Sequence, residues 1–174
     1  MKEQSKSNYV TNRLTTVLFT IYLIALYWIL LLKLGVRFSY MATRRANVIP
    51  FNEPFLLTGE NILNVVIFVP LGIYTGILFG RWMLGKKLLF FLLLSVVVEG
   101  LQFLLRLGAF DVTDVITNTT GGIIGLVIFK AIEKAFNNHG KTQKFINSIA
   151  VTGTVFMILL LLLLKMKMLP VRYQ

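Results

Sequence analysis

The stretch VVVEGLQFLLRLGAFDVTDVITN, residues 96–118, decides the fold of this chain. It joins the end of one apolar run to the start of the next through a link at residues 107–110. Three polar residues precede the link at positions i, i+3 and i+7, and three follow it at the same spacing: Glu99, Gln102 and Arg106, then Asp111, Asp114 and Asn118. On helices, each set lies on one face.

The link is short enough to make the two helices antiparallel neighbours, so their polar faces can meet near one end of the pair. Polar side chains at this spacing inside apolar sequence are costly in lipid, and by default they mark a functional site. We therefore expect the helices around this link to hold the chemistry of the protein.

The composition is that of an integral membrane protein. Of the 174 residues, 56% are hydrophobic and 14% are charged, and the mean hydropathy is +0.77. A soluble domain of this length would be about 25% charged. Cysteine is absent, which excludes a disulfide framework, a thiol nucleophile and a thiolate metal site. The expected fold class is all-α, a polytopic bundle of about five membrane spans.

Each expected span has about 19 residues, enough to cross a hydrocarbon core of ~30 Å at ~1.5 Å per residue. The spans are expected near residues 14–32, 61–79, 88–105, 112–129 and 145–164. We divide the chain into an N-terminal segment, a core of four spans with a long loop at 33–60, a basic loop and a fifth span with a basic tail: residues 1–13, 14–132, 133–144 and 145–174. His139 in the basic loop is expected at the surface.

Small residues in two spans indicate close helix packing. Gly72, Gly76 and Gly80 recur every fourth residue in the second span, and Gly121 and Gly125 repeat that spacing in the fourth. Such stripes let another helix approach closely. A proline at position 70 predicts a kink in the second span.

The net charge of +11 comes from 18 Lys and Arg against 7 Asp and Glu. These cations are spread over the loops that flank apolar runs, which disfavours nucleic-acid binding and favours topology signals. With a cytoplasmic N-terminus, the inner segments hold ten cations and the outer ones eight. We therefore predict a plasma-membrane protein with its N-terminus inside and its C-terminus outside.

The topology brings the polar residues together whichever way the chain is oriented. The long loop, which contains NVIPFNEPF at residues 47–55, shares a membrane face with the start of the second span, the end of the third and the start of the fourth. The candidate catalytic residues there are Glu99 and Asp114. The candidate headgroup-binding residues are Arg44, Arg45, Asn47, Glu60, Asn61, Asn64, Gln102, Arg106, Asp111 and Asn118. With the N-terminus inside, this cluster faces the cell exterior.

Such a cluster can do a limited range of chemistry. Glu99 and Asp114 could share a proton and act as general acid and base. The oxygens could hold a hard cation, although we assign no metal ligand, and the sequence identifies no cofactor. The arginines could clamp a phosphate or carboxylate. The structural alternative is a network of salt bridges and hydrogen bonds, for instance Arg106 with Asp111, that locks the helices together.

Several short motifs occur in one order along the chain: Asn47-Val48-Ile49-Pro50-Phe51, Asn61-Ile62-Leu63-Asn64, Phe68-Val69-Pro70-Leu71-Gly72, Glu99 with Gln102, Arg106-x-x-x-Phe110-Asp111-Val112-x-Asp114, and Asn118, Thr119 and Gly121. In this combination, over about residues 15–130, the chain resembles the VanZ-like family of bacterial membrane proteins. The resemblance implies an association with low-level resistance to the glycopeptide antibiotic teicoplanin, without rewriting of peptidoglycan precursors. It implies no particular biochemical activity.

Three hypotheses follow. The first is a VanZ-like membrane protein that lowers the action of lipoglycopeptides at the cell surface by engaging the headgroup of a membrane lipid or lipid-linked cell-wall precursor. The second is a membrane hydrolase or transferase acting on a lipid-linked or polyprenyl-phosphate substrate, with Glu99 and Asp114 as acid and base. The third is a small transporter, which the one-ended polarity disfavours because a route needs polar residues through the whole bilayer.

Overall fold

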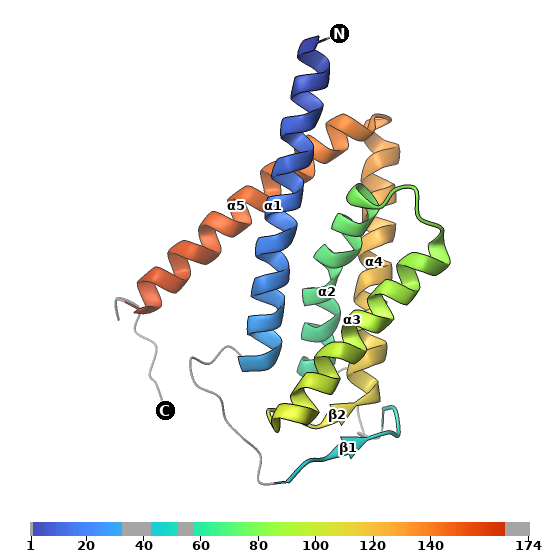
Figure 1. The fold of residues 1–174 in the computed structure, drawn as a ribbon, viewed down its shortest axis with the longest axis vertical. Helices are drawn as coiled ribbons and strands as arrows, with labels where there is room; N and C mark the ends of the chain where they lie inside the picture. The colour runs from blue at the N-terminus through green and yellow to red at the C-terminus, as the bar shows by residue number, and fades with distance from the viewer. Residues whose placement is uncertain (1, 33–42, 52–57, 166–174) are drawn as a thin grey trace.

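A computed structural model describes residues 2–32, 43–51 and 58–165 of the chain. These residues form an all-α fold of long helices with one pair of very short strands (Figure 1). In order, the elements are α1 (Lys2–Leu32), β1 (Ala46–Asn47), α2 (Gly59–Leu78), α3 (Leu84–Leu105), β2 (Phe110–Asp111), α4 (Val112–Phe136) and α5 (His139–Lys165). The end of the NVIPFNEPF stretch, residues 52–55, lies outside the described residues.

Helices α2 and α4 form the centre of the bundle, and their backbones meet at glycines. A methyl group on Gly121 would run into the carbonyl oxygen of Val65, and one on Gly125 would run into that of Val69. Gly72 of α2 is packed in the same way against the backbone of α4. Only glycine permits this approach, so the spacing in the sequence correctly predicted the contact.

The glycine stripe of α2 contributes to this contact over part of its length. Gly76 faces the ring of Phe129 on α4. For Gly80, the expected packing role is wrong, because a Cβ there would meet only the carbonyl of Gly76 from its own helix, at 3.6 Å. The reason is that α2 ends at Leu78 and the chain turns away.

Helices α1 and α3 cover this central pair. The ring of Phe91 on α3 lies against Gly122 of α4, and it is fully buried. On the other side, α1 packs on α2 through aromatic rings, with 5.4 Å between the ring centres of Phe19 and Tyr74 and 5.8 Å between those of Tyr22 and Tyr74. Apolar burial and ring packing therefore hold the four helices α1, α2, α3 and α4 together.

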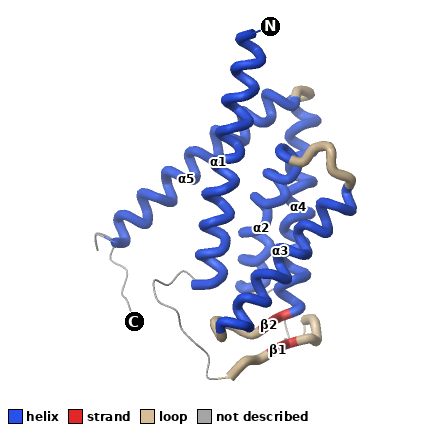
Figure 2. The backbone as a smooth tube through the Cα atoms, viewed as in Figure 1, coloured by secondary structure: helices blue, strands red, loops and turns tan. Residues whose placement is uncertain are grey.

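The helices place the chain's connections at two opposite ends. Strands β1 and β2 lie at one end, together with the start of α2, the end of α3 and the start of α4 (Figures 1 and 2). We call this the polar end. The α2–α3 turn and the α4–α5 turn lie at the other end, which we call the basic end. This arrangement is the one that the order of apolar runs predicted.

At the basic end, the helices run further than the apolar runs suggested. Helix α4 continues to Phe136 and α5 begins at His139, so most of the expected basic loop is helical. The lysines, alanine and glutamate there are good helix formers at a water-exposed position. Asn137, in the left-handed conformation with φ 46°, makes the turn. His139 is exposed as expected, but it has a partner in Glu133, with 2.7 Å between Nδ1 and Oε1.

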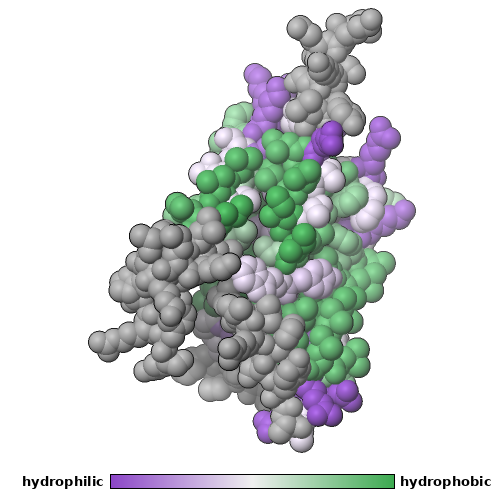
Figure 3. Space-filling view, turned by 60° about the vertical axis from the view of Figure 1, so that its left-hand side comes forward, coloured by the Kyte–Doolittle hydropathy of each residue, from purple (hydrophilic) through white to green (hydrophobic). Residues whose placement is uncertain are grey.

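Within the described residues, four helices are long and apolar enough to cross a membrane, at Thr11–Leu31, Gly59–Leu78, Leu84–Leu105 and Val112–Phe136. Figure 3 shows hydrophobic side chains over the middle of one face, with hydrophilic ones towards its two ends. The protein is therefore an all-α membrane protein. Helix α5 runs obliquely across α1 (Figure 1), and its crossing of the membrane stays a prediction.

Buried amides fasten α5 to α1 near the basic end. Gln143 Nε2 donates to Asn12 Oδ1 at 2.9 Å and to Thr15 Oγ1 at 2.8 Å. Asn147 Nδ2 donates to the same hydroxyl at 2.9 Å and to the carbonyl of Thr11 at 3.3 Å. Scattered single polar residues gave no signal of this contact in the sequence. It satisfies polar groups that would otherwise be buried without partners.

Candidate functional site

The first loop is tied to the α3–α4 linker at the polar end by a short parallel sheet. Ala46 pairs with Phe110 and Asn47 with Asp111. The backbone N–H of Phe110 donates to the carbonyl of Arg45 at 3.0 Å, and Asn47 Nδ2 donates to Asp111 Oδ2 at 3.0 Å. The motif that begins at Asn47 is therefore held directly against the start of α4.

Glu99 is the buried acid of this end. Its side chain is 1% exposed, and its Oε2 accepts a hydrogen bond from the backbone N–H of Asp111 at 3.2 Å. Asp111 in turn caps α4, because its Oδ1 accepts from the backbone N–H of Thr113 at 2.7 Å. An aspartate at this position satisfies an amide of the first turn and favours the positive end of the helix dipole.

A second acid joins α2 to α4. Asn64 Nδ2 donates to Asp114 Oδ1 at 2.7 Å, a short charge-assisted bond. Beside it, the hydroxyl of Thr113 accepts from the backbone N–H of Phe51 at 3.0 Å, which fixes the end of the described loop. Phe51 itself has φ 54°, a strained conformation for an aromatic residue. The contacts of Asp114, Asn64 and Thr113 thus bring α2, α4 and the loop together.

Two buried amides connect the cluster to neighbouring helices. Asn118 is fully buried, and its Nδ2 donates to Ser95 Oγ of α3 at 3.0 Å, while its Oδ1 has no hydrogen-bond partner in the structure. Gln102 Nε2 donates to the carbonyl of Leu30 at 3.0 Å and so ties α3 to the end of α1. The Asn118–Ser95 pair therefore lies between α3 and α4, and the contact of Phe91 with Gly122 lies further from the polar end on the same two helices.

The three predicted arginines lie exposed around this cluster. Arg44 Nη2 donates to the carbonyl of Leu104 at 3.2 Å, and its guanidinium lies 5.9 Å from the ring centre of Phe103. Arg45 contributes its backbone carbonyl to the sheet. Arg106 ends α3 in the left-handed conformation, with φ 59°. All three arginines are thus exposed at the polar end, Arg44 and Arg45 just before β1 and Arg106 at the end of α3.

The proposed ion pair of Arg106 with Asp111 is absent. Between described residues, the structure holds one ion pair, that of His139 with Glu133 at the basic end. The reason is geometric: the left-handed residue at the end of α3 turns the Arg106 side chain into solvent, while Asp111 is used by Asn47 and by its own helix cap. Of the network that we considered as the structural alternative, hydrogen bonds between the helices are present and this salt bridge is not.

The remaining predicted residues lie at the start of α2. Glu60 is exposed in its first turn, and Asn61 is largely buried.

Glu99 lies among like charges, since Asp114, Asp111 and Glu60 all act on it electrostatically, with Asp114 the strongest of the three. In the described part of the chain, no three His, Asp or Glu side chains are placed to hold one metal ion.

Comparison with known proteins identifies the family. The profile of the VanZ/LLP1 family matches residues 19–133. Protein VanZ of Enterococcus faecium is 35% identical over 148 residues, which are 83% of this chain and 88% of that protein. The chain belongs to the VanZ/LLP1 family. No solved structure matches it.

The family match contains the whole candidate site. All twelve predicted site residues lie between positions 44 and 118, inside the region shared with the VanZ/LLP1 family. Helix α5, in contrast, begins after the matched region ends. The polar end is therefore part of what this chain shares with VanZ-family proteins.

Sequence reasoning missed two contributors to the VanZ-family site. Ser95 partners Asn118, and Thr113 holds the loop through Phe51. Ser95 stands four residues before Glu99, on the same helix face, and this spacing was the available signal. Thr113 carried no signal of its own, because its contact depends on where a residue 62 positions away folds back.

Proposed function

We propose that this VanZ-family membrane protein lowers the susceptibility of its host to lipoglycopeptide antibiotics such as teicoplanin at the cell surface. Its family membership supports the general role. The finer part of the proposal is that the polar end engages the headgroup of a membrane lipid or a lipid-linked cell-wall precursor. The action of an antibiotic on such precursors at the outer surface would then be lowered, either directly or because the protein engages the precursors.

The observation that carries the proposal is the burial of the Glu99 carboxylate among other acids and amides. Buried ionisable groups in a membrane protein are expensive, and they are kept at sites of function. Here the carboxylate oxygens of Glu99 and Asp111 offer acceptors to a hydroxyl or ammonium group. Lipid and cell-wall headgroups commonly carry hydroxyl and ammonium groups, and they also carry phosphate.

The arginines supply the second half of the site. Arg44 and Arg45, just before β1, and Arg106, at the end of α3, are exposed at the same end. Guanidinium groups bind phosphate with two parallel hydrogen bonds. A headgroup that places its phosphate among the arginines and its hydroxyl or amine towards the acids would satisfy both sets of charges. The proposal requires the polar end to face outward, as the distribution of basic residues predicts.

The test uses a susceptible Gram-positive host that expresses the wild type, the double variant Glu99→Gln/Asp114→Asn, the control Glu133→Gln, or no protein. The control changes the same chemical group at the opposite end of the molecule, where Glu133 pairs with His139. Fluorescent teicoplanin bound per cell and the concentration that inhibits growth are measured at matched expression. Membrane insertion of each variant is verified by fractionation.

We expect the wild type and Glu133→Gln to lower labelling and raise tolerance, and the double variant to behave like empty vector. Equal tolerance for the wild type and empty vector would contradict the resistance role. Full activity of the double variant would contradict the role of the acids while leaving the resistance role in place.

The electrostatic coupling of Glu99 with Asp114 favours a second candidate, an enzyme acting on a lipid-linked or polyprenyl-phosphate substrate. In that case, the two acids would serve as general acid and base. Incubation of the purified protein with radiolabelled polyprenyl phosphate separates the candidates. Turnover that Glu99→Gln abolishes supports the enzyme, whereas binding without turnover supports headgroup engagement.

A further inference from the structure

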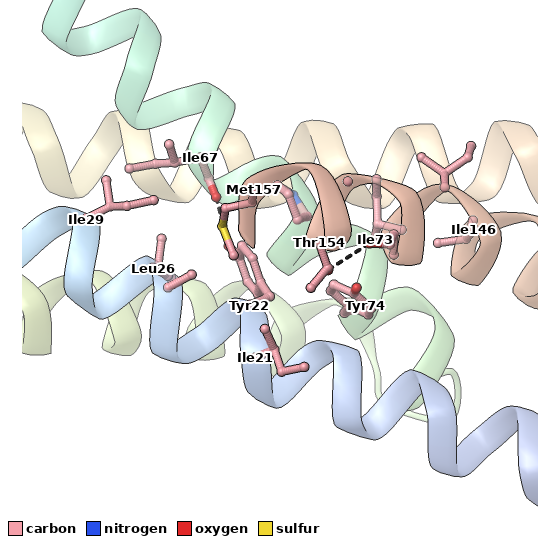
Figure 4. A pocket seen from close by; sticks show the side chains of 15 residues that line it. Ile21, Tyr22, Leu26, Ile29, Ile67, Ile73, Tyr74, Ile146, Thr154 and Met157 are labelled. Atoms are coloured by element: carbon pink, nitrogen blue, oxygen red, sulfur yellow. Dashed lines mark hydrogen bonds between the residues drawn. The ribbon is translucent and has the colours of Figure 1, made fainter. Parts of the chain in front are cut away.

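A second feature of the molecule lies away from the polar end. Helices α1, α2 and α5 line a cavity of about 360 Å³ that is open on one side (Figure 4). Its lining is almost wholly apolar, with the side chains of Ile21, Ile29, Ile73, Ile146 and Met157 turned into it. A volume of this size falls within the range of small-molecule sites in proteins.

The cavity lies at the depth of the hydrocarbon core. Its walls come from the middle of the candidate spans of α1 and α2, including Pro70. At this depth, the surroundings are lipid tails, and an apolar cavity holds hydrocarbon in preference to water. The space is also too small for a helix, which is about 10–12 Å across with its side chains. A single hydrocarbon chain is therefore the occupant that fits.

Two tyrosines line this cavity, and their hydroxyl groups differ in hydrogen bonding. Tyr22 donates to the carbonyl of Ile67 at 2.8 Å and is thereby satisfied. Tyr74 is 5% exposed, and within the described residues its hydroxyl makes no hydrogen bond, although the side chain lines the cavity (Figure 4). A hydroxyl at the wall of an apolar cavity, without a hydrogen-bond partner, is costly when the cavity holds only hydrocarbon. An occupant that brings a carbonyl oxygen to Tyr74 would remove this cost.

The charges near the cavity favour a lipid with an anionic headgroup. Tyr74 stands one turn before the end of α2, so it lies towards the basic end. Exposed cations surround that end, on α1, α4 and α5: Arg13, Lys130, Lys134, Lys141 and Lys144. Glu133 is the only acid in the sequence after Asp114. A basic membrane-facing end attracts anionic lipid.

We propose that the cavity between α1, α2 and α5 binds one acyl chain of an anionic membrane phospholipid, with its ester carbonyl at the Tyr74 hydroxyl and its phosphate at the basic end. This site is separate from the polar end in its helices, its membrane face and its chemistry. It is independent of the proposed resistance role.

The experiment uses purified protein in phosphatidylcholine nanodiscs that contain a small fraction of photoactivatable lipid. One arm carries phosphatidylglycerol and the other phosphatidylcholine, both with the same diazirine-bearing acyl chain. Labelled peptides are identified by mass spectrometry. The blocking variant is Gly153→Leu, because Gly153 lines the cavity and a side chain there meets no atom within 4 Å at its Cβ. Gly85→Leu is the matched control, since Gly85 on α3 has the same open space and lies outside the cavity.

We expect phosphatidylglycerol to label peptides from α1, α2 and α5 more strongly than phosphatidylcholine does. Gly153→Leu should reduce this labelling about tenfold, because the side chain occupies the space of the acyl chain. Tyr74→Phe, which removes one hydroxyl and preserves the packing, should weaken it about two- to tenfold. Gly85→Leu should match the wild type.

Three results would overturn the proposal. Equal labelling by the two lipids contradicts the anionic headgroup, and labelling that Gly153→Leu does not reduce contradicts the cavity as the site. Unchanged labelling of Tyr74→Phe contradicts the hydrogen bond. Because Tyr74→Phe keeps the ring contacts with Phe19 and Tyr22, this arm holds even if the bulkier Gly153→Leu does not yield folded protein.

Discussion

The carboxylate of Glu99 accepts a hydrogen bond from the backbone N–H of Asp111, with 3.2 Å between Oε2 and N. The same aspartate pairs with Asn47 through its backbone and its side chain. One buried acid on α3 thus orders the start of α4, and the start of α4 orders the first loop. These contacts belong to the candidate site and also stabilise the polar end of the bundle. Substitutions therefore have to distinguish an effect on function from an effect on stability.

Substitutions at Glu99 separate its charge from its role as an acceptor. Glu99→Leu leaves the Asp111 N–H buried without an acceptor, and it should lower the free energy of unfolding by about 1–3 kcal/mol. Glu99→Gln keeps an acceptor oxygen, so it should cost less than about 1 kcal/mol while removing the charge. Thermal unfolding of the purified variants in detergent measures both. Equal losses for the two variants would show that the hydrogen bond to Asp111 contributes nothing to stability.

Glycine substitutions test the contact of α2 with α4. Gly125→Ala should lower the free energy of unfolding by about 1–3 kcal/mol, because the methyl group meets the carbonyl oxygen of Val69 and forces the helices apart. Gly80→Ala should be neutral or stabilise the protein by up to about 1 kcal/mol, since its surroundings are open. The same detergent unfolding assay compares them. A Gly80→Ala variant as unstable as Gly125→Ala would mean that α2 and α4 pack further than Leu78.

Much of this fold was predictable because apolar length and small-residue spacing act locally. The apolar runs around Pro70 and Glu99 gave the positions of the spans, and the order of spans alone put the polar residues at one end. The glycine spacing predicted the close approach of another helix, although not that Gly72 and Gly125 would meet each other. These predictions depend only on helix geometry and on the cost of polar groups in lipid.

The contacts that were missed depend on residues far apart in sequence. The pairing of Ala46 with Phe110 satisfies backbone groups, which every residue has, so no side-chain pattern announces it. The bond of Thr15 to Asn147 joins residues 132 positions apart. Arg106 was placed on the polar face by its spacing, yet the helix ends there in a left-handed residue that turns it outward. Spacing arguments fail where a helix stops.

Two substitutions of Arg106 should differ in stability but not in function. Arg106→Ala keeps the strained φ of 59°, whereas Arg106→Gly relieves it, so the glycine variant should be more stable than the alanine variant by about 1 kcal/mol. If the guanidinium engages a headgroup phosphate as proposed, both variants should lose teicoplanin tolerance equally. Unfolding in detergent and the inhibitory concentration measure the two effects. Wild-type tolerance in Arg106→Gly would remove this arginine from the proposed site.

The orientation of the bundle is testable with single cysteines, because the natural chain has none. Ile49 is 59% exposed at the polar end, and Asn138 is exposed in the α4–α5 turn. With the N-terminus inside, a membrane-impermeant maleimide should label Ile49→Cys on intact cells and Asn138→Cys only after permeabilisation. Gln174→Cys should be labelled on intact cells if α5 crosses the membrane.

Each labelling pattern has a distinct consequence. If Gln174→Cys requires permeabilisation as Asn138→Cys does, α5 stays on the inner side and the chain has four spans. This outcome leaves the polar end in place, because α1 to α4 alone position it. Labelling of Asn138→Cys on intact cells, with Ile49→Cys protected, would instead place Glu99 and the polar end on the inner side of the membrane.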